Sequence, residues 1–406
     1  WQTGDIKTSN FTAADGKGFF VDTNGGAITA TLPAGSAGAI ISFQDYRNSF
    51  QTNNLTITPN GSEKINTGAG PVTLSTEGEG ATLVYIDSTV GWRSIQDNQF
   101  ADEGAAFVEA TGGTITTVCT NFKVHTFTGP GSFVVSNAGA PTGSNTVDYL
   151  VVAGGGGGGG GLGGGGGAGG YRESGGTASG CYTVSPLGSS PSSVAALPVS
   201  VQSYPITVGG GGTGRTSPGA AGGNGNPSIF STITSTAGGG GGTVGTPPKN
   251  SGSDGGSGGG GAGQNPETNG GSGNNPPTTP PQGNNGGVAN PSPTYFGGGG
   301  GGALEVGRPG IPPASPAIGV GGGGATSSIN GTPTARAGGG GGGGDGPAKS
   351  GGSGGGGASG AFSQGNGTAG TANTGGGGGG GSGGGPTGGD GAAGGSGIVI
   401  IRYRFQ

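Results

Sequence analysis

The first part of the chain, up to about residue 98, alternates hydrophobic and polar positions with a period of two. Side chains two residues apart lie on the same face of a strand, so this pattern predicts half-buried β-strands. Gly, Asn, Asp and Pro separate the stretches at the short intervals that are typical of an antiparallel sandwich. We therefore predict an N-terminal antiparallel β-sandwich over residues 1–98, with Trp92 in its core. Its expected strands are residues 18–21, 27–32, 39–43, 55–58, 72–74 and 81–86.

A second group of strand patterns begins after a polar and acidic linker at residues 99–104. Its members are residues 114–118, 122–127, 132–135 and 147–152. The stretch 397–403 is strongly hydrophobic but lies far along the chain, and an unpaired strand would expose its hydrogen-bonding edge. We therefore expect it to pair with the second group. The sequence thus predicts a second small β domain made of residues 105–152 and 396–406, interrupted by an insertion at residues 153–395.

The insertion is dominated by glycine. The chain contains 116 glycines and 27 prolines in 406 residues, and pure glycine runs such as 154–161, 297–302 and 375–381 recur through the insertion. A strict Gly-X-Y period is absent, which excludes collagen. Glycine chains can adopt the extended helix of the polyproline II type, whose backbone groups bond to neighbouring helices instead of within the helix. We predict an ordered polyglycine II bundle clamped by the strands at its two ends, and a flexible linker is the alternative.

Charge and cysteine content exclude several classes of function. The formal net charge is −5, and the 14 Lys and Arg residues form no basic run, so nucleic acid is not an expected partner. No stretch approaches the roughly 20 apolar residues of a membrane-spanning helix, and we expect no membrane insertion. His125, Cys119 and Cys181 are too few for a zinc site without carboxylates, so we expect no metal and no cofactor. The two cysteines flank the first glycine run and are the one pair available for a disulfide, although nothing fixes their separation.

Catalytic chemistry is poorly represented in the sequence. His125 alternates with Val124 and Phe127 in a predicted strand, as a structural histidine does, and the few carboxylates stand in turns or linkers. A catalytic site needs a base, a nucleophile or paired acids held rigidly in a pocket. We therefore expect no enzyme activity and assign no catalytic residue.

Residues suited to recognition occur between the glycine runs. Glycine helices have no side chains with which to select a partner, so specificity must come from the spacers, where aromatic and hydrogen-bonding residues favour binding. We predict that spacers 171–207, 264–296 and 303–317 form surface loops that carry recognition. For Tyr295 and Phe296, packing against the flank of the bundle is the alternative. The receptor-binding candidates are Tyr171, Arg172, Tyr182, Tyr204, Asn274, Asn275, Tyr295, Phe296 and Arg308.

Four segments, in order, resemble a known family. They are residues 147–153 (VDYLVVA), the glycine-rich stretch 154–172 that follows, residues 204–209 (YPITVG) and the terminal residues 397–403 (GIVIIRY). This combination is similar to the glycine-rich domain of bacteriophage tail-fibre and virion surface adhesin proteins, over about residues 120–406. The resemblance implies a tail fibre or another extracellular appendage of a virion, in which loops between polyglycine helices bind a host receptor. The long N-terminal β region and the irregular run lengths depart from that family's pattern.

The resemblance also sets the expected partners. These are fibre neighbours or further copies of the chain, with a trimer expected, and a host surface protein or polysaccharide. The start at Trp1 and the lack of methionine are expected of a processed end or of a segment of a longer protein. Two other functions remain open. One is a cellular extracellular filament or matrix protein. The other is an ice-binding glycine-rich protein, which regular threonine spacing on one face would favour, although the spacers of the insertion lack such spacing.

Overall fold

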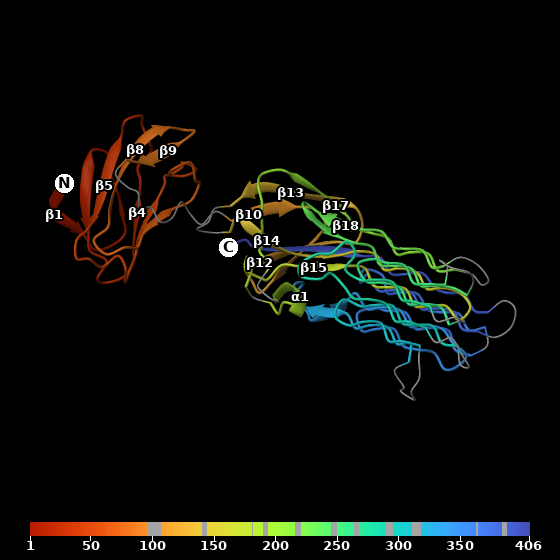
Figure 1. Ribbon diagram of the computed structural model, residues 1–406. Coiled ribbons are helices and arrows are strands. Elements are labelled where there is room, and N and C mark those ends of the chain that lie inside the picture. The colour runs from red at the N-terminus through yellow and green to blue at the C-terminus, as the bar shows by residue number, and fades with distance from the viewer. Residues whose placement is uncertain are drawn as a thin grey trace. The chain divides into compact units, whose positions relative to one another are not determined.

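The computed structural model describes most of the chain as strands and extended segments. Within the described residues the one helix is the four-residue α1 (Pro186–Ser189), so the predicted all-β class is confirmed. Residues 1–95 form one compact unit, and the described residues from 107 onward, apart from Gly139, form a second (Figure 1). The described residues are 1–95, 107–139, 144–180, 182–189, 194–215, 221–244, 250–263, 268–289, 295–310, 318–362, 364–383 and 388–406.

The first unit contains two sheets, ordered β1-β3-β5-β8-β9 and β2-β4-β6-β7. From β1 to β6 the chain alternates between the two sheets, so each strand reaches its parallel neighbour through a strand of the opposite sheet. The pairs β1–β3, β3–β5, β2–β4 and β4–β6 are parallel, whereas β5–β8, β8–β9 and β6–β7 are antiparallel. The strands are β1 (Gln2–Lys7), β2 (Phe11–Thr12), β3 (Lys17–Val21), β4 (Ile28–Thr31), β5 (Ile40–Asp45), β6 (Leu55–Thr58), β7 (Val72–Leu74), β8 (Gly80–Asp87) and β9 (Gly91–Ser94).

The prediction of an antiparallel N-terminal sandwich is therefore wrong for the first six strands. Parallel strands need a crossover connection instead of a tight hairpin, and here a strand of the other sheet supplies it. Hydrophobic and polar residues alternate with a period of two in parallel and antiparallel strands alike, so the sequence pattern does not distinguish the two pairings. The predicted place of Trp92 is confirmed, because its side chain is fully buried in the hydrophobic core. The Trp92 indole packs edge-on against Tyr85, with ring centroids 5.5 Å apart, and its Nε1 donates to Glu63 Oε2 at 3.2 Å.

The outer face of the β2-β4-β6-β7 sheet carries two rows of threonines. Their neighbours along each strand, such as Ile28 and Ala30, are buried in the core, so the threonines lie on the opposite face. One row pairs Thr12 with Thr31 and Thr31 with Thr58, and the other pairs Thr29 with Thr56 and Thr56 with Thr73. Neighbouring strands lie about 4.8 Å apart and alternate residues about 6.7 Å apart along a strand. The result is a small, regular grid of threonines.

The second unit begins with a β-sandwich. One sheet is ordered β10-β13-β17-β18-β19 and the other β11-β12-β22-β14-β15, with β16 also paired to β14. Side chains from both sheets, including Phe133, Tyr149, Phe230 and Tyr403, share one hydrophobic core. The strands are β10 (Val108–Thr111), β11 (Thr114–Val118), β12 (Phe122–Phe127), β13 (Gly131–Ala138), β14 (Thr146–Val152), β15 (Tyr171–Glu173), β16 (Leu197–Pro198), β17 (Ser203–Thr207), β18 (Ser228–Phe230), β19 (Ile233–Ser235) and β22 (Ile398–Arg404).

The C-terminal strand β22 lies between β12 and β14 and is antiparallel to both. Val124 stands opposite Arg402 on one side, and Leu150 stands opposite Ile400 on the other. The expected pairing of the terminal strand with the second group of strands is therefore confirmed. Since β22 is central in its sheet, the sheet is complete only after the whole glycine-rich insertion has been made.

The insertion forms an ordered bundle of extended segments that run side by side away from the sheets (Figure 1). Three successive glycines of residues 154–159 donate to three different neighbouring segments, and the same neighbour recurs every third residue. This threefold period is that of a polyglycine II helix, which confirms the predicted bundle. The bonds are Gly154 N to Asn226 O and Gly157 N to Gly223 O; Gly155 N to Gly395 O and Gly158 N to Ala392 O; Gly156 N to Gly167 O and Gly159 N to Gly164 O.

Close packing explains why the inner helices are pure glycine. A Cβ atom on Gly156 would lie 2.1 Å from Gly239 O, and one on Gly166 would lie 2.1 Å from Gly156 O. Either distance is far below van der Waals contact, so no other residue fits. Helices at the edge of the bundle have a solvent-facing side, and residues such as Asn224 and Asn226 are exposed there. The glycine runs therefore mark the centre of the bundle.

The bundle has two distinct ends, which we call the sheet end and the distal end. Helices leave the sheets after β14, β17, β19 and the hairpin strand β21 (Thr334–Arg336), and others return into β15, β18, β20 (Ala325–Ser327) and β22. At the sheet end, residues such as Ala303 and Ile329 cover the outer face of β12, β14 and β22 and form a second core with Leu150 and Ile400.

Candidate functional site

The distal end of the bundle is the candidate binding site. Its first turn joins the helices 154–160 and 163–170, and both Gly161 and Leu162 have positive φ there, 49° and 55°. Gly161 N donates to Gly389 O, and Leu162 O accepts from Gly263 N, at 2.9 and 2.8 Å. The turn is thus held on two sides by other helices. The Leu162 side chain stays partly exposed.

An aromatic ring and a cation meet at this end. Phe296 forms a bridge with Gly344, and a Cβ atom on Gly344 would lie 2.1 Å from the Phe296 ring. The Phe296 ring therefore packs directly against the Gly344 backbone, which is possible only because Gly344 has no side chain. Lys349 Nζ lies 5.1 Å from the centre of the same ring, within the range of a cation–π interaction.

Three further side chains complete this distal site. A Cβ atom on Gly383 would lie 2.4 Å from both Asp345 Oδ1 and Leu162 Cδ2, so Asp345 and Leu162 lie next to each other. Phe362 N donates to Gly346 O at 2.7 Å, and the Phe362 ring is 62% exposed. The distal site defined here consists of Leu162, Phe296, Asp345, Lys349 and Phe362. It offers aromatic, aliphatic, acidic and basic groups at the end of a bundle whose inner helices are glycine.

The predicted receptor-binding residues do not gather in one place. Tyr295 and Phe296 lie at the distal end, where both are partly buried. Arg308 is exposed on a helix along the flank of the bundle, where its carbonyl accepts from Gly299 N. Asn274 and Asn275 lie at the sheet end, in a turn in which the Asn274 side chain accepts from Thr278 and Gln282 N and the Asn275 amide donates to Asp254. The side chains of both asparagines therefore form hydrogen bonds that stabilise the turn.

The expected surface loop at residues 171–207 is wrong, because this segment contains β15, α1, β16 and β17. Tyr171 and Tyr204 are 1% and 7% exposed, and each belongs to a hydrophobic core. Arg172, in β15, is half-buried and stands opposite Val151. Tyr182 is half-buried, with the Arg402 guanidinium 5.0 Å from its ring centre. Tyr171 and Tyr182 thus lie in the core between bundle and sheet, whereas Tyr204 lies in the core between the two sheets.

A buried carboxylate organises that junction. Glu173 accepts hydrogen bonds from the Tyr171 hydroxyl at 3.0 Å, from Ser185 N at 3.1 Å and from the Ser327 hydroxyl at 2.5 Å. Burial raises the pKa of the Glu173 carboxyl, while the hydrogen bonds from Ser185, Ser327 and Tyr171 oppose the rise. The Arg336 guanidinium is also buried, and burial lowers its pKa. The Glu173 carboxylate therefore links β15 to the segments that contain Ser185 and Ser327.

The distal residues that sequence reasoning missed are Leu162, Asp345 and Lys349. A signal for the first was present, because Leu162 is the one residue that interrupts the glycines from 154 to 167. An isolated bulky residue inside a run that tolerates none must lie at a turn. Asp345 follows the run 338–344 in the same way. Lys349 had no sequence signal, since its place depends on where Phe296 lies.

Metal and disulfide chemistry find little support in the part of the chain that the structure describes. No group of three or more His, Cys, Asp or Glu side chains there could hold a metal ion. Cys119 is exposed, and Cys181 lies outside the described residues, so the disulfide stays a prediction. Among the described residues, no helix has the length and hydrophobicity needed to cross a membrane.

The fold and the bundle define a class of protein, namely an all-β protein in which a polyglycine II bundle is inserted into a sandwich and closed by its last strand. Residues 128–404 match the family described as glycine-rich domain. Because the match spans more than half of the chain, the protein belongs to the glycine-rich domain family. No curated protein matches the sequence.

Proposed function

We propose that this protein is a structural and adhesive extracellular protein, of the kind found in phage tail fibres or on virion surfaces, and that its distal site binds a host-cell receptor. The observation that carries the proposal is the contrast between the inner helices, which are glycine, and a distal end where Leu162, Phe296, Asp345, Lys349 and Phe362 lie together. A bundle cross-linked by backbone hydrogen bonds in three directions suits a rigid support for such a site.

The chemistry of the distal site fits recognition better than catalysis. An exposed Phe362 ring and the stacked pair of Phe296 and Lys349 offer apolar area and charge, and interfaces are enriched in such groups. A single carboxylate, Asp345, lies within this set, whereas hydrolysis of a polysaccharide usually takes two carboxylates. The proposal therefore assigns no reaction to the protein. It includes self-association, with the trimer that the resemblance to fibre proteins implies.

Adsorption of the purified, fluorescently labelled chain to a panel of bacterial isolates tests this function. The variants Phe362→Ala and Phe296→Ala/Lys349→Ala remove side chains of the distal site. The control Val201→Ala changes a 64% exposed residue of the sandwich, between β16 and β17. We expect the distal variants to lose adsorption at least tenfold, as hot-spot residues do, while the control adsorbs like the parent. Equal adsorption by all variants, or adsorption by none of the proteins including the parent, would count against the proposal and favour a filament or matrix role.

One observation favours ice binding as a second candidate function. The glycine helices show no regular threonines, but the first unit presents Thr12, Thr31 and Thr58 in one row and Thr29, Thr56 and Thr73 in the next. Such a regular grid of methyl and hydroxyl groups can order water. Thermal hysteresis and inhibition of ice recrystallisation measure the activity directly, and Thr31→Lys/Thr56→Lys would abolish it by breaking both rows.

A further inference from the structure

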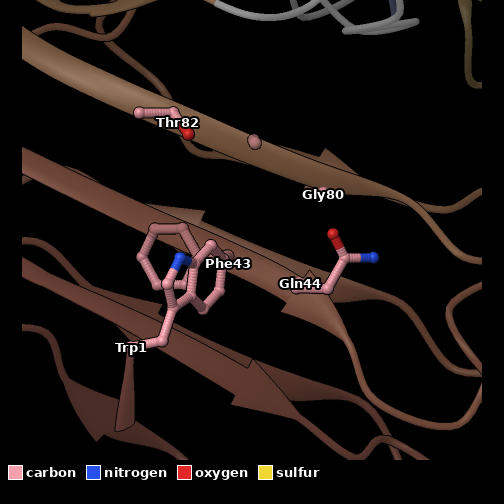
Figure 2. Close-up of a pocket in the computed structure, with 6 residues that line it drawn as sticks. Trp1, Phe43, Gln44, Gly80 and Thr82 are labelled. Atoms are coloured by element: carbon pink, nitrogen blue, oxygen red, sulfur yellow. The ribbon is translucent and has the colours of Figure 1, made fainter.

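The first unit has a groove on the outer face of its β1-β3-β5-β8-β9 sheet. Its volume is about 260 Å³. Figure 2 shows the Trp1 indole on one side of the hollow, with Thr82 and Gln44 across from it. None of the lining side chains is charged. They are Trp1, Phe43, Gln44, Gly80, Ala81 and Thr82.

Two glycines create this hollow. Across the outer face, Gly18 stands opposite Ser42, and Gly80 stands opposite Gln44. A Cβ atom on Gly18 would lie 2.6 Å from the Trp1 ring, so the indole lies directly on the backbone of β3. Gly80 likewise leaves the floor open. The groove thus exists because two positions on the outer face of the sheet, Gly18 and Gly80, have no side chain.

The Trp1 ring begins a strip of exposed aromatic side chains. Trp1 is 60% exposed, and its ring centroid lies 5.0 Å from that of Phe20. Phe20 in turn lies 6.4 Å from Tyr46, which is 48% exposed. One face of the indole rests on Gly18, so its other face is available to a ligand. Flat aromatic faces pack well against apolar C–H surfaces.

A fixed hydrogen-bonding group lies beside this strip. Gln44 Nε2 donates to Gly78 O at 2.8 Å, which orients the amide. Its Oε1 points over Gly80, because a Cβ atom there would lie 2.4 Å from Gln44 Oε1. Gln44 Oε1 is thus an acceptor aimed into the groove. On the same face the hydroxyls of Ser42 and Thr82 lie 3.0 Å apart and bond to each other.

We infer that this groove binds a neutral saccharide, with a pyranose ring stacked on Trp1 and a ring hydroxyl donating to Gln44 Oε1. A sugar ring has an apolar C–H face and polar edges, and the groove offers an indole face beside neutral oxygen acceptors. A polyanion would find no cationic side chain among the lining residues. The buried centre of a protein–protein interface is more apolar than the rest of the surface, and here Gln44, Thr82 and Ser42 lie beside the aromatic strip. This site lies in the first unit and is separate from the proposed distal site.

Tryptophan fluorescence of the full chain tests the inference without any need for adsorption. The chain has two tryptophans, and Trp92 is fully buried whereas Trp1 is 60% exposed. Titration with the hexaoses of the cello, malto, manno and N-acetylchito series should quench or blue-shift the Trp1 emission with at least one of them. Calorimetry should show weaker binding of the same saccharide to Trp1→Phe and about tenfold weaker binding to Gln44→Ala. Trp92 emission reports that each variant is folded.

The control Ile86→Ala changes a 45% exposed side chain on β8 that does not line the groove, and it should bind like the parent. Three outcomes would overturn the inference: none of the hexaoses changes the fluorescence, Gln44→Ala binds as tightly as the parent, or Trp1→Phe changes the oligomeric state instead of saccharide binding. The last outcome would identify the strip as a contact with a second copy of the chain. Loss of cell adsorption in distal variants would affect the first proposal alone.

Discussion

The Nε2 atom of His125 lies 3.0 Å from the hydroxyl of Tyr403, although the two residues are 278 positions apart in the chain. His125 is in β12 and Tyr403 in β22, so this bond joins the sandwich to the strand that follows the insertion. Nδ1 lies 2.8 Å from the Gly112 carbonyl oxygen, which can only accept. Nδ1 therefore carries the proton in the neutral ring, and Nε2 accepts from Tyr403.

The first prediction concerns pH. Burial lowers the pKa of His125, with the Gly112 carbonyl opposing and Lys123 adding to the effect. Below about pH 6.5 the unfolded chain takes up a proton that the folded chain does not, so the stability contributed by neutral His125 is present above that pH and falls as the pH decreases. Calorimetry of the second unit should show a loss of up to about 1.4 kcal/mol per pH unit. His125→Gln, which cannot titrate, should be less stable at pH 8, and the difference should shrink towards pH 5. A constant difference would contradict the assignment.

The second prediction concerns the closing strand. Deletion of residues 397–406 removes β22 from between β12 and β14 and leaves two unpaired edges and an opened core. We expect the second unit to lose protection from proteolysis across the sandwich and the glycine module together, and to aggregate through its exposed edges. The first unit should still melt with its own Trp92 signal. An ordered glycine module in the truncated chain would show that the bundle folds without the clamp.

The third prediction compares two glycines. Gly156→Ala places a methyl group 2.1 Å from Gly239 O and should lower the free energy of unfolding by about 3 kcal/mol, at the upper end for overpacking. Gly210→Ala is the matched control, because its nearest neighbour would be Asn226 Nδ2 at 3.7 Å. The control should be neutral or slightly stabilising, since alanine has less freedom in the unfolded chain. Chemical denaturation monitored by circular dichroism gives both values, and equal effects would contradict the packing argument.

The fourth prediction concerns Glu173. Glu173→Ala leaves the donors of Tyr171, Ser185 and Ser327 without their shared acceptor. Unpaired buried donors cost about 1–3 kcal/mol each, so the variant should lose several kcal/mol and loosen the junction of bundle and sheet. Glu173→Gln keeps one acceptor oxygen and should lose less. Hydrogen exchange at β15 and at β20 should rise together in both variants. A rise confined to β15 would show that Glu173 does not couple the two segments.

The glycine bundle and the closing strand of the second unit could be predicted from sequence because their signals are local, whereas β15, β16 and β17 lie in a segment that was predicted to be a surface loop. The glycine runs indicate positions where no side chain fits. The hydrophobic stretch that contains β22 indicates a strand that is buried between other strands. The mixed pairing of the first unit could not be predicted, since parallel and antiparallel strands share the same alternation. The choice between them depends on which sheet each strand joins, as with β3 and β4, and no single residue encodes it.

The candidate sites were predicted only in part. Phe296 was identified by type, but Lys349 reaches it across more than fifty residues of chain, and that distance closes only when the helices pack. Tyr171 and Tyr204 carry the same aromatic signal and are buried instead. The groove at Trp1 depends on Gly18, which the sequence pattern placed in a strand, and on Gly80, which it placed just before one. The pattern does not show that the missing side chains of these two glycines leave a hollow. Residue type indicates what a side chain can bind, and only the arrangement of the strands decides which side chains meet.

The threefold period of the bundle also determines how such a protein can diversify. One residue inserted into an inner run turns everything after it by about a third of a turn and misaligns all three sets of hydrogen bonds. By contrast, doubling the length of a distal connection costs only about 0.6 kcal/mol in closure entropy. Insertions, deletions and recombination can therefore accumulate at the distal end while the inner runs stay fixed. A lineage carrying this module could acquire new binding specificities one loop at a time, without having to find a new fold.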